Sequence, residues 1–354
     1  MSSCLLINDM INKILKNLRA ILAIYFSRQL LVCFSEFRRV SAAPCLADTM
    51  DARTWTTELP AGHEPHNGSI TYCSNTWFLA VRTANYGYSK VFKRLEVPGG
   101  PSHVDSATWL LELDDDFRIS ERTILSDAAY RDISGPARNG FTDPRLFEWK
   151  DQLWGLWSAE RVLSDDWSNI RNTMALGLIE DTEMKQIKFL ASPHGRAREK
   201  NWMPWIIAEE LRFVYALANM EVYRLREGTL ELLHAAAAPD PQLCGYSGSS
   251  QLQPWGSDWI CVAHYAARAI RAASAQFIPS FYLHRFVVVS SDFTIKALSP
   301  EFFLEHKGTE FCAGLVIRDD SVILSYGVRD CESRIMRMPI GKVNELLKPP
   351  QTIV

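Results

Sequence analysis

The sequence has no surplus of positive charge and no long apolar run. Its 38 lysine and arginine residues are outnumbered by 41 aspartate and glutamate residues, which gives a formal net charge of −3. Proteins that bind the phosphate backbone of nucleic acids ordinarily carry a basic excess, so we expect no nucleic-acid partner. With 47% hydrophobic and 22% charged residues, the chain can bury a large core, and its composition is that of neither a disordered nor a multi-span membrane protein.

Motifs for metal and nucleotide binding are also missing. The eight cysteines include no CxxC pair and no histidine at metal-ligand spacing, and no GxGxxG, P-loop, GxSxG or HExxH pattern occurs. We therefore expect no metal and no organic cofactor. Cys73, Cys261 and Cys312 lie in apolar, strand-like runs, where buried free thiols are common. This pattern favours a reducing compartment and a cytoplasmic location.

Residues 1–50 differ from the rest of the chain. Basic residues outnumber acidic ones there, and apolar residues recur at helical spacing, which predicts a basic amphipathic helix in a leader or extension. The uncharged stretch from Ala20 to Ser27 is far shorter than the roughly twenty residues of a membrane span. We expect no integral span; a packed extension, a targeting segment and contact with a membrane surface stay open. Residues 51–354 are expected to form the functional domain.

Short β-rich runs separated by turn residues continue from about residue 65, and five of them resemble one another. Each copy has a polar entry, an apolar strand, a polar turn and a second apolar strand. The spacing between copies leaves room for a four-stranded sheet each time, which predicts an all-β fold, a five-bladed β-propeller; a pair of β-sandwiches is the structural alternative. The copies begin at Asn67, Asp143, Lys200, Ser247 and Phe311.

Polar residues recur at the same point of each copy. The inner strands of a propeller converge on one axis, so equivalent polar residues line one central pocket. The first strands supply Asn67, Asp143, Arg145, Lys200, Asn201, Ser247, Ser249 and Glu310, and the ends of the second strands supply Arg82, Asn85, Tyr86, Glu160, Arg161, His264, Tyr265 and Asp330.

Taken in order, these motifs resemble the five-bladed propellers of glycoside hydrolase family 130, which contains mannoside phosphorylases and some mannosidases, and related propeller modules found beside glycosyltransferases. The resemblance covers about residues 60–348. It rests on NGSI (67–70), VRTANY (81–86), GFTDPRLF (140–147), EKNWMPW (199–205), SGSSQL (247–252), VAHY (262–265), YLHRF (282–286) and EFCAGLVIRDDSVILSYGVRD (310–330).

The resemblance implies an enzyme that cleaves or forms a glycosidic bond, most readily of a mannoside, in an oligosaccharide or glycoside substrate. It makes Asp143 of the DPR motif the general acid. Thr142 stands before it, where related sequences often carry an acidic residue, so the local electrostatics differ. Asp330 matches a position that hydrogen-bonds the sugar. The remaining substrate-binding candidates are Asn67, Arg82, Asn85, Tyr86, Glu160, Asn201 and His284.

Two reactions stay open within this interpretation. A phosphorylase needs one carboxylic acid and a cationic cradle for inorganic phosphate, its co-substrate, whereas an inverting hydrolase needs a second carboxylate to activate water. The predicted cradle consists of Arg145, Lys200, His264 and Arg285. The candidates for a second carboxylate are Glu199, Glu310 and Glu160.

Two other functions stay open beside it. The same funnel suits a glycosyltransferase, or a module that serves one, with a sugar-phosphate or nucleotide-sugar donor. A non-catalytic glycan-binding propeller is the alternative from another class. A homo-oligomer is compatible with all of these.

Overall fold

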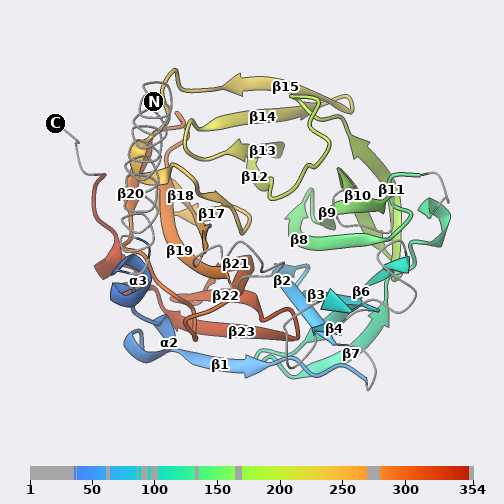
Figure 1. The fold of residues 1–354 in the computed structure, drawn as a ribbon, viewed down its shortest axis with the longest axis horizontal. Coiled ribbons are helices and arrows are strands. Elements are labelled where there is room, and N and C mark those ends of the chain that lie inside the picture. Colours follow the sequence, from blue (N-terminus) through green and yellow to red (C-terminus); the bar gives the residue numbers. More distant parts are fainter. Residues whose placement is uncertain are drawn as a thin grey trace, which may run out of the picture.

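The computed structural model describes residues 36, 38–60, 64–85, 87–88, 95–96, 103–131, 135–163, 170–268 and 280–350. Within them, five antiparallel sheets form a ring around one axis (Figure 1). The predicted fold class is therefore confirmed as a five-bladed β-propeller. Most of the predicted leader helix, residues 1–35 and 37, lies outside the described residues.

Each blade is one sheet, with its first strand beside the axis. Blade I consists of β2 (Pro65–Cys73), β3 (Thr76–Ala84), β6 (Ser106–Leu113) and β7 (Ile119–Ile124). Blade II consists of β8 (Phe141–Trp149), β9 (Gln152–Val162), β10 (Ile170–Glu180) and β11 (Glu183–Leu190). Blade III consists of β12 (Met203–Ile207), β13 (Glu210–Ala216), β14 (Glu221–Arg226) and β15 (Thr229–His234).

Blades IV and V complete the ring. Blade IV consists of β16 (Ser247–Gly248), β17 (Gln253–Trp255), β18 (Asp258–Arg268), β19 (Ser280–Val289) and β20 (Ile295–Leu298). Blade V consists of β21 (Glu310–Arg318), β22 (Ser321–Val328), β23 (Glu332–Pro339) and β1 (Arg53–Thr56). The short elements outside the blades are α2 (Leu46–Thr49), α3 (Ile340–Leu346), the 3-10 turns η2 (Ala128–Tyr130) and η3 (Pro241–Leu243), and the pair β4 (Gly87–Tyr88) and β5 (Leu95–Glu96).

An N-terminal strand closes the ring. β1 pairs antiparallel with β23, so blade V takes its outermost strand from the start of the propeller and its other three from the end (Figure 1). The ladder hydrogen bonds thus tie two distant parts of the chain together, and β1 covers the edge that β23 would otherwise expose.

The five repeats are the inner hairpins of the five blades. The sequence predicts the third turn at Glu209 and Glu210, and the other four are found where it predicts them, at Ser74–Asn75, Lys150–Asp151, Gly256–Ser257 and Asp319–Asp320. The third lies one residue earlier, at Ala208 and Glu209, because Glu210 already pairs with Ile207 in the ladder. Both turn residues have positive φ angles, 48° and 64°, as a two-residue hairpin with the twist of its strands requires.

Apolar residues pack between blades, which is why this long chain forms a single ring. Each of the five largest buried clusters joins two neighbouring blades. In one of them, Val262 and Phe286 of blade IV pack with Leu315 and Leu324 of blade V. Each blade therefore covers an apolar face of the next, and burial of this surface is the main stabilising contribution.

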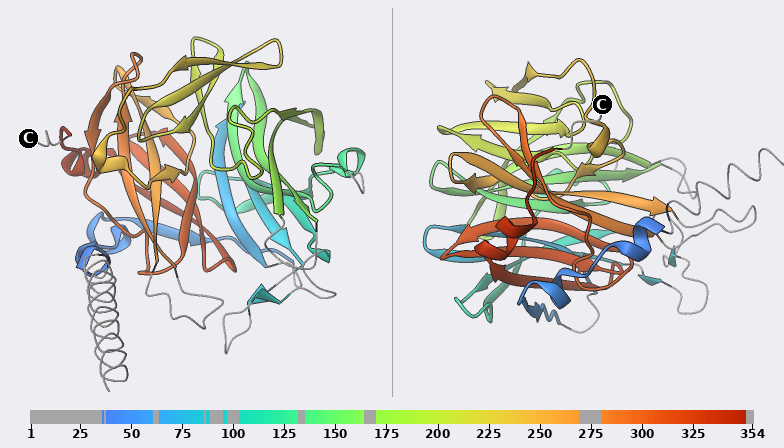
Figure 2. Two further views of the ribbon diagram at one scale, coloured as in Figure 1. Left: turned by 45° about the horizontal axis from the view of Figure 1, so that its top comes forward. Right: turned by 90° about the vertical axis from the view of Figure 1, so that its left-hand side faces the viewer.

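The described end of the extension packs on blades IV and V (Figure 2). Leu46 and Met50 are buried in the cluster between these blades. The Arg39 guanidinium forms an ion pair with Glu301, with Nε 2.7 Å from Oε1 and 2.6 Å from Oε2. A fragment that starts at Met50 would lose Leu46 and this ion pair.

Hydrogen bonds from a backbone N–H of one blade to a serine hydroxyl of its neighbour close the middle of the axis. The Leu146 N–H donates to Ser69 Oγ (2.9 Å), and the Ile70 N–H donates to Ser325 Oγ (2.8 Å). A Cβ at Gly314 would lie 2.4 Å from the Ile70 nitrogen, so only glycine permits this approach of β21 to β2. The filled axis separates two polar ends: one at the start of the inner strands and one at their far end.

Candidate active site

The first polar end joins blades I and II through Asp143. The Asn67 amide nitrogen donates to Asp143 Oδ1 at 3.0 Å. Arg82, at the end of β3, places a guanidinium nitrogen 3.8 Å from the same oxygen. Asn67 and Arg82 of the first repeat thus both contact the carboxylate of Asp143 in the second repeat.

A bulge in β8 presents Asp143. The pairing of β8 with β9 shifts register between Thr142 and Arg145, and Asp143 has a φ of 50°. Aspartate tolerates this left-handed conformation better than most residues, and the following Pro144 has no N–H to pair. The buried Thr142 donates its hydroxyl to the Ser158 carbonyl (3.0 Å), so no neighbouring carboxylate stands at this position.

Arg145 ties four blades together beneath Asp143. Its side chain is fully buried and donates to three oxygens: the Asp143 carbonyl (2.6 Å), Asn201 Oδ1 (3.2 Å) and the Ser249 carbonyl (2.9 Å). Its guanidinium carbon lies 5.1 Å from the centre of the Phe311 ring, an attractive cation–π arrangement. Arg145 is thus both a charge beside Asp143 and a structural brace.

His264 adds a neutral polar group next to this brace. Its Nδ1 lies 3.0 Å from Ser249 Oγ, and its ring stacks on Tyr282 with 5.5 Å between centroids. Burial, together with the nearby positive charges of Lys200 and Arg145, holds the pKa of His264 well below its usual range. In this environment it offers hydrogen bonds but no positive charge.

The charges of the cluster keep Asp143 ionised. Burial alone would raise the pKa of Asp143, but Arg82, Arg145, the Asn67 amide and Lys200 outweigh it, and the pKa lies below its ordinary value. Lys200 is exposed at the entry of blade III. Three cations therefore surround one carboxylate, which leaves a net positive charge that suits an anionic group.

The two predicted catalytic carboxylates Glu199 and Glu310 accept hydrogen bonds that hold loops in place. Glu199 is buried and accepts from Trp202 Nε1 (3.0 Å), the Tyr215 hydroxyl (3.2 Å) and the Ser192 hydroxyl. These contacts fasten the loop before Lys200 and Asn201 to blade III.

Glu310 is likewise buried and accepts hydrogen bonds from three backbone N–H groups, those of residues 304–306. Burial raises the pKa of Glu310 to about 7, against the lowering effect of these N–H groups. Its carboxyl group shapes the 304–306 loop between blades IV and V.

Other predicted residues lie apart from the Asp143 cluster. The Arg285 guanidinium lies 3.6 Å from Glu301 and over the Tyr246 ring, in the group that holds Arg39. His284 is fully buried beside Phe302, and burial lowers its pKa to about 3. Arg285 is partly exposed and His284 pairs with His264 across the β18–β19 ladder, so their roles in substrate or phosphate binding stay predictions.

Three more predicted residues occupy strand ends. Asn85 is exposed and bridges the His103 carbonyl and the Asp105 N–H, both at 2.8 Å. Asp330 lies in the turn between β22 and β23 with a φ of 51°. Glu160 is partly exposed on β9, and Tyr86 lies outside the described residues.

Sequence reasoning missed His66. Its buried imidazole lies near Arg82 and Asp143, and burial and Arg82 lower its pKa to about 3. It directly precedes the polar entry at Asn67, which is the signal that could have found it. In the described parts of the chain, no group of three or more metal-ligating side chains occurs, and no helix is long and apolar enough to cross a membrane.

Comparison with known proteins confirms the fold. No protein-family model matches the sequence, and no curated protein does so either. Among solved structures, β-1,2-mannobiose phosphorylase from Listeria innocua matches with a TM-score of 0.54 and 12% identity, covering 84% of this chain and 99% of that one. The propeller predicted from the motifs is thus the fold of a known mannoside phosphorylase.

Two further structures show what else this fold carries. One comes from a study titled as showing that the GH130 family of mannoside phosphorylases contains glycoside hydrolases that target β-1,2-mannosidic linkages in Candida mannan (TM-score 0.50, 11% identity, 78% and 84% coverage). The other is MPT-1, a GDP-Man-dependent mannosyltransferase from Leishmania mexicana (TM-score 0.53, 13% identity, 83% and 92% coverage). One architecture therefore hosts three reactions, and the site must distinguish them.

Proposed function

We propose that this protein is a carbohydrate-active enzyme that cleaves or forms a mannosidic bond, with inorganic phosphate as co-substrate and Asp143 as the proton donor. The observation that carries the proposal is one carboxylate among Arg82, Arg145 and Lys200, while Glu199 and Glu310 are engaged in structural hydrogen bonds. A single acid with a cationic surround meets the needs of phosphorolysis better than those of water activation.

In the proposed reaction, a phosphate oxygen attacks the anomeric carbon of the terminal mannose. The bond from that carbon to the bridging oxygen breaks, and the bridging oxygen takes the proton from Asp143. The products are mannose 1-phosphate and a glycan shortened by one residue. In the reverse direction, the Asp143 carboxylate accepts a proton from the acceptor hydroxyl.

The ionised state of Asp143 fits this scheme. Without an anion nearby, Arg82, Arg145 and Lys200 favour the carboxylate, which is the form that the synthetic direction uses. Phosphate bound beside these cations offsets their charge, so the pKa of Asp143 rises and the residue can carry the proton that cleavage requires.

The first experiment measures sugar release from β-1,2-linked manno-oligosaccharides by the full chain, with and without inorganic phosphate. Phosphate-dependent formation of mannose 1-phosphate supports the proposal. Free mannose formed equally well without phosphate overturns phosphorolysis in favour of hydrolysis.

A mannosyltransferase is the second candidate, because the same cations also suit the diphosphate of a nucleotide sugar. Incubation with GDP-mannose and a mannobiose acceptor distinguishes it. Chain extension from GDP-mannose, without phosphorolysis, favours transfer. If the protein binds sugar but forms no product, and the Asp143→Asn variant binds sugar with the same affinity, the result favours a non-catalytic glycan-binding propeller.

A further inference from the structure

A second polar cavity lies at the far end of the inner strands. It has a volume of about 290 Å³ and receives residues from blades I to V, among them Thr71 of β2, Glu148 of β8 and Val316 of β21. Glu148 follows Asp143 by five positions on β8, which separates the two backbone positions by roughly 15 Å along the strand. The cavity is therefore distinct from the Asp143 cluster.

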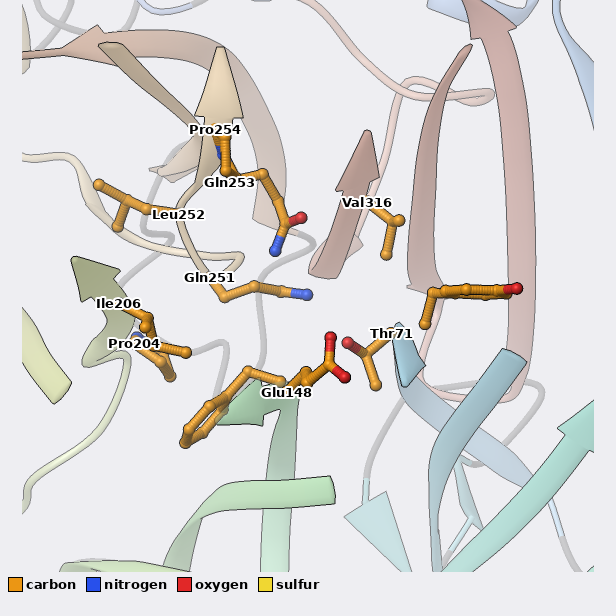
Figure 3. A pocket seen from close by; sticks show the side chains of 11 residues that line it. Thr71, Glu148, Pro204, Ile206, Gln251, Leu252, Gln253, Pro254 and Val316 are labelled. Carbon is orange, nitrogen blue, oxygen red and sulfur yellow. The ribbon is translucent and has the colours of Figure 1, made fainter. Parts of the chain in front are cut away.

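Gln251 forms the floor between the two ends. Its side chain is buried, its amide nitrogen donates to the Ile70 carbonyl (3.1 Å), and its amide oxygen accepts from the Leu315 N–H (3.3 Å). These two bonds set the orientation of the amide. The amide nitrogen carries a second hydrogen, and Figure 3 shows this nitrogen directed into the cavity.

Four polar side chains converge there. In Figure 3, the Glu148 carboxylate and the Thr71 hydroxyl face the amides of Gln251 and Gln253 across the open centre. The group offers a carboxylate that accepts two hydrogen bonds, a hydroxyl that donates and accepts, and amides that do both. Such a mixture matches adjacent hydroxyl groups, each of which donates and accepts.

The remaining walls are apolar, contributed by side chains such as Phe147, Ile206 and Pro254. Sugar rings present C–H faces to walls of this kind while their hydroxyls reach polar groups. The volume lies at the lower limit for small-molecule sites, which suits one sugar residue better than a longer segment.

The charge of the cavity excludes other ligands. Among the described residues that line it, Glu148 is the only charged one. An anion such as phosphate would meet this carboxylate, and no basic side chain is among the described residues that line the cavity. A divalent cation prefers several oxygen ligands with more than one carboxylate, and one carboxylate does not supply them.

We propose that this cavity is a second carbohydrate-binding site, which holds one neutral sugar residue through Glu148, Thr71 and Gln253. The choice of a mannoside as the probe rests on the proposed function; the site itself does not. Its occupant touches neither Asp143 nor the cations around it, so the site retains glycan without taking part in the reaction.

The test uses calorimetric titration of full-length Asp143→Asn protein with mannose and β-1,2-mannobiose, so that turnover does not interfere. Glu148→Ala and Gln253→Ala, each added to this background, are expected to weaken one binding event at least tenfold. Asp151→Asn is the matched control, because Asp151 is an exposed carboxylate in the turn after β8 and does not line the cavity. Circular dichroism and the melting temperature verify that each variant is folded.

Two results overturn the inference. The first is sugar binding that neither Glu148→Ala nor Gln253→Ala changes. The second is displacement of the Glu148-dependent sugar by inorganic phosphate or by methylammonium at equal concentration, because the site would then prefer ions.

The two proposals fail separately. If sugar binding depends on Glu148 but the protein turns over no donor, the second site is supported and the proposed function is contradicted. If turnover depends on phosphate but sugar binding does not depend on Glu148, the proposed function is supported and the second site is contradicted.

Discussion

The two ends of the propeller axis carry opposite electrostatics, although one strand supplies a carboxylate to each. Near the start of β8, Asp143 lies close to the cations Arg82, Arg145 and Lys200. Near its end, Glu148 lies beside two amides, a hydroxyl and apolar side chains. The same type of group therefore lies among three cations at one end and in a polar cavity with no lining cation among the described residues at the other. Neighbouring blades, and not the strand itself, decide which.

The largest expected effect is a loss of catalytic activity at the Asp143 end. Asp143→Asn removes the proposed proton donor, and we expect kcat/KM for phosphorolysis of β-1,2-mannobiose to fall about 10³-fold. Asn keeps the left-handed backbone conformation at this position. Asp151→Asn is the control, since Asp151 has a φ of 55°, close to the 50° of Asp143; equal rates for the two variants would remove Asp143 from the mechanism.

Arg145→Met tests whether the cationic end also braces the ring. It removes three buried hydrogen bonds and the charge beside Asp143, so we expect the free energy of unfolding to fall by about 3 kcal/mol. Urea denaturation measures it. Arg122→Met, at an exposed position of β7, should change stability by less than about 1 kcal/mol; similar losses for both would contradict the bracing role.

Glu310 provides a contrast with Asp143, because burial raises the pKa of Glu310 whereas nearby cations lower the pKa of Asp143. Its pKa is raised from 4.5 to about 7, so between these values the folded protein binds a proton that the unfolded chain releases. Its contribution to stability is complete below pH 4.5 and is lost as the pH rises to 7, by at most about 3 kcal/mol. Glu310→Gln should reduce this slope in denaturation series across pH 5–7.5; an unchanged slope would show that other groups cause it.

The smallest expected effect is the change of ligand affinity with ionic strength. Phosphate affinity at the Asp143 end should fall about threefold between 50 and 300 mM sodium chloride, because salt screens the partly exposed charges. Sugar binding at the Glu148 end should stay within about twofold, since a neutral ligand carries no charge to screen. Parallel titrations measure both, and equal salt dependence would contradict the assignment of opposite electrostatics.

Much of the architecture could be predicted, because blades repeat. The alternation of apolar strands and polar turns indicates hairpins, and five similar hairpins predict the ring. Part of the cluster could also be predicted, from the polar residues at the entries of the repeats and at the ends of their second strands. Asn67, Asp143, Arg145 and Asn201 from the entries meet Arg82 and His264 from the strand ends across blades.

Other predictions depended on partners that the sequence does not reveal. Glu199 is adjacent to Lys200 in the chain, yet its carboxyl group is enclosed by Ser192, Trp202 and Tyr215. Arg285 forms an ion pair with Glu301, the same carboxylate that binds Arg39 of the extension. A strand position gives the face on which a side chain lies, but the neighbouring blade and loops decide whether a ligand can reach it.

The amino-acid sequence by itself determined the all-β class, the fivefold repeat and the hairpin turns, because these depend on local periodicity and on turn residues that tolerate positive φ angles. The tertiary structure decided which carboxylate is surrounded by cations, which ones fasten loops, and where the second cavity lies. Those properties arise from contacts between residues far apart in the chain, such as Asn67 with Asp143 and Gln251 with Ile70. Burial and charge act over distances in space, and only the closed ring sets those distances.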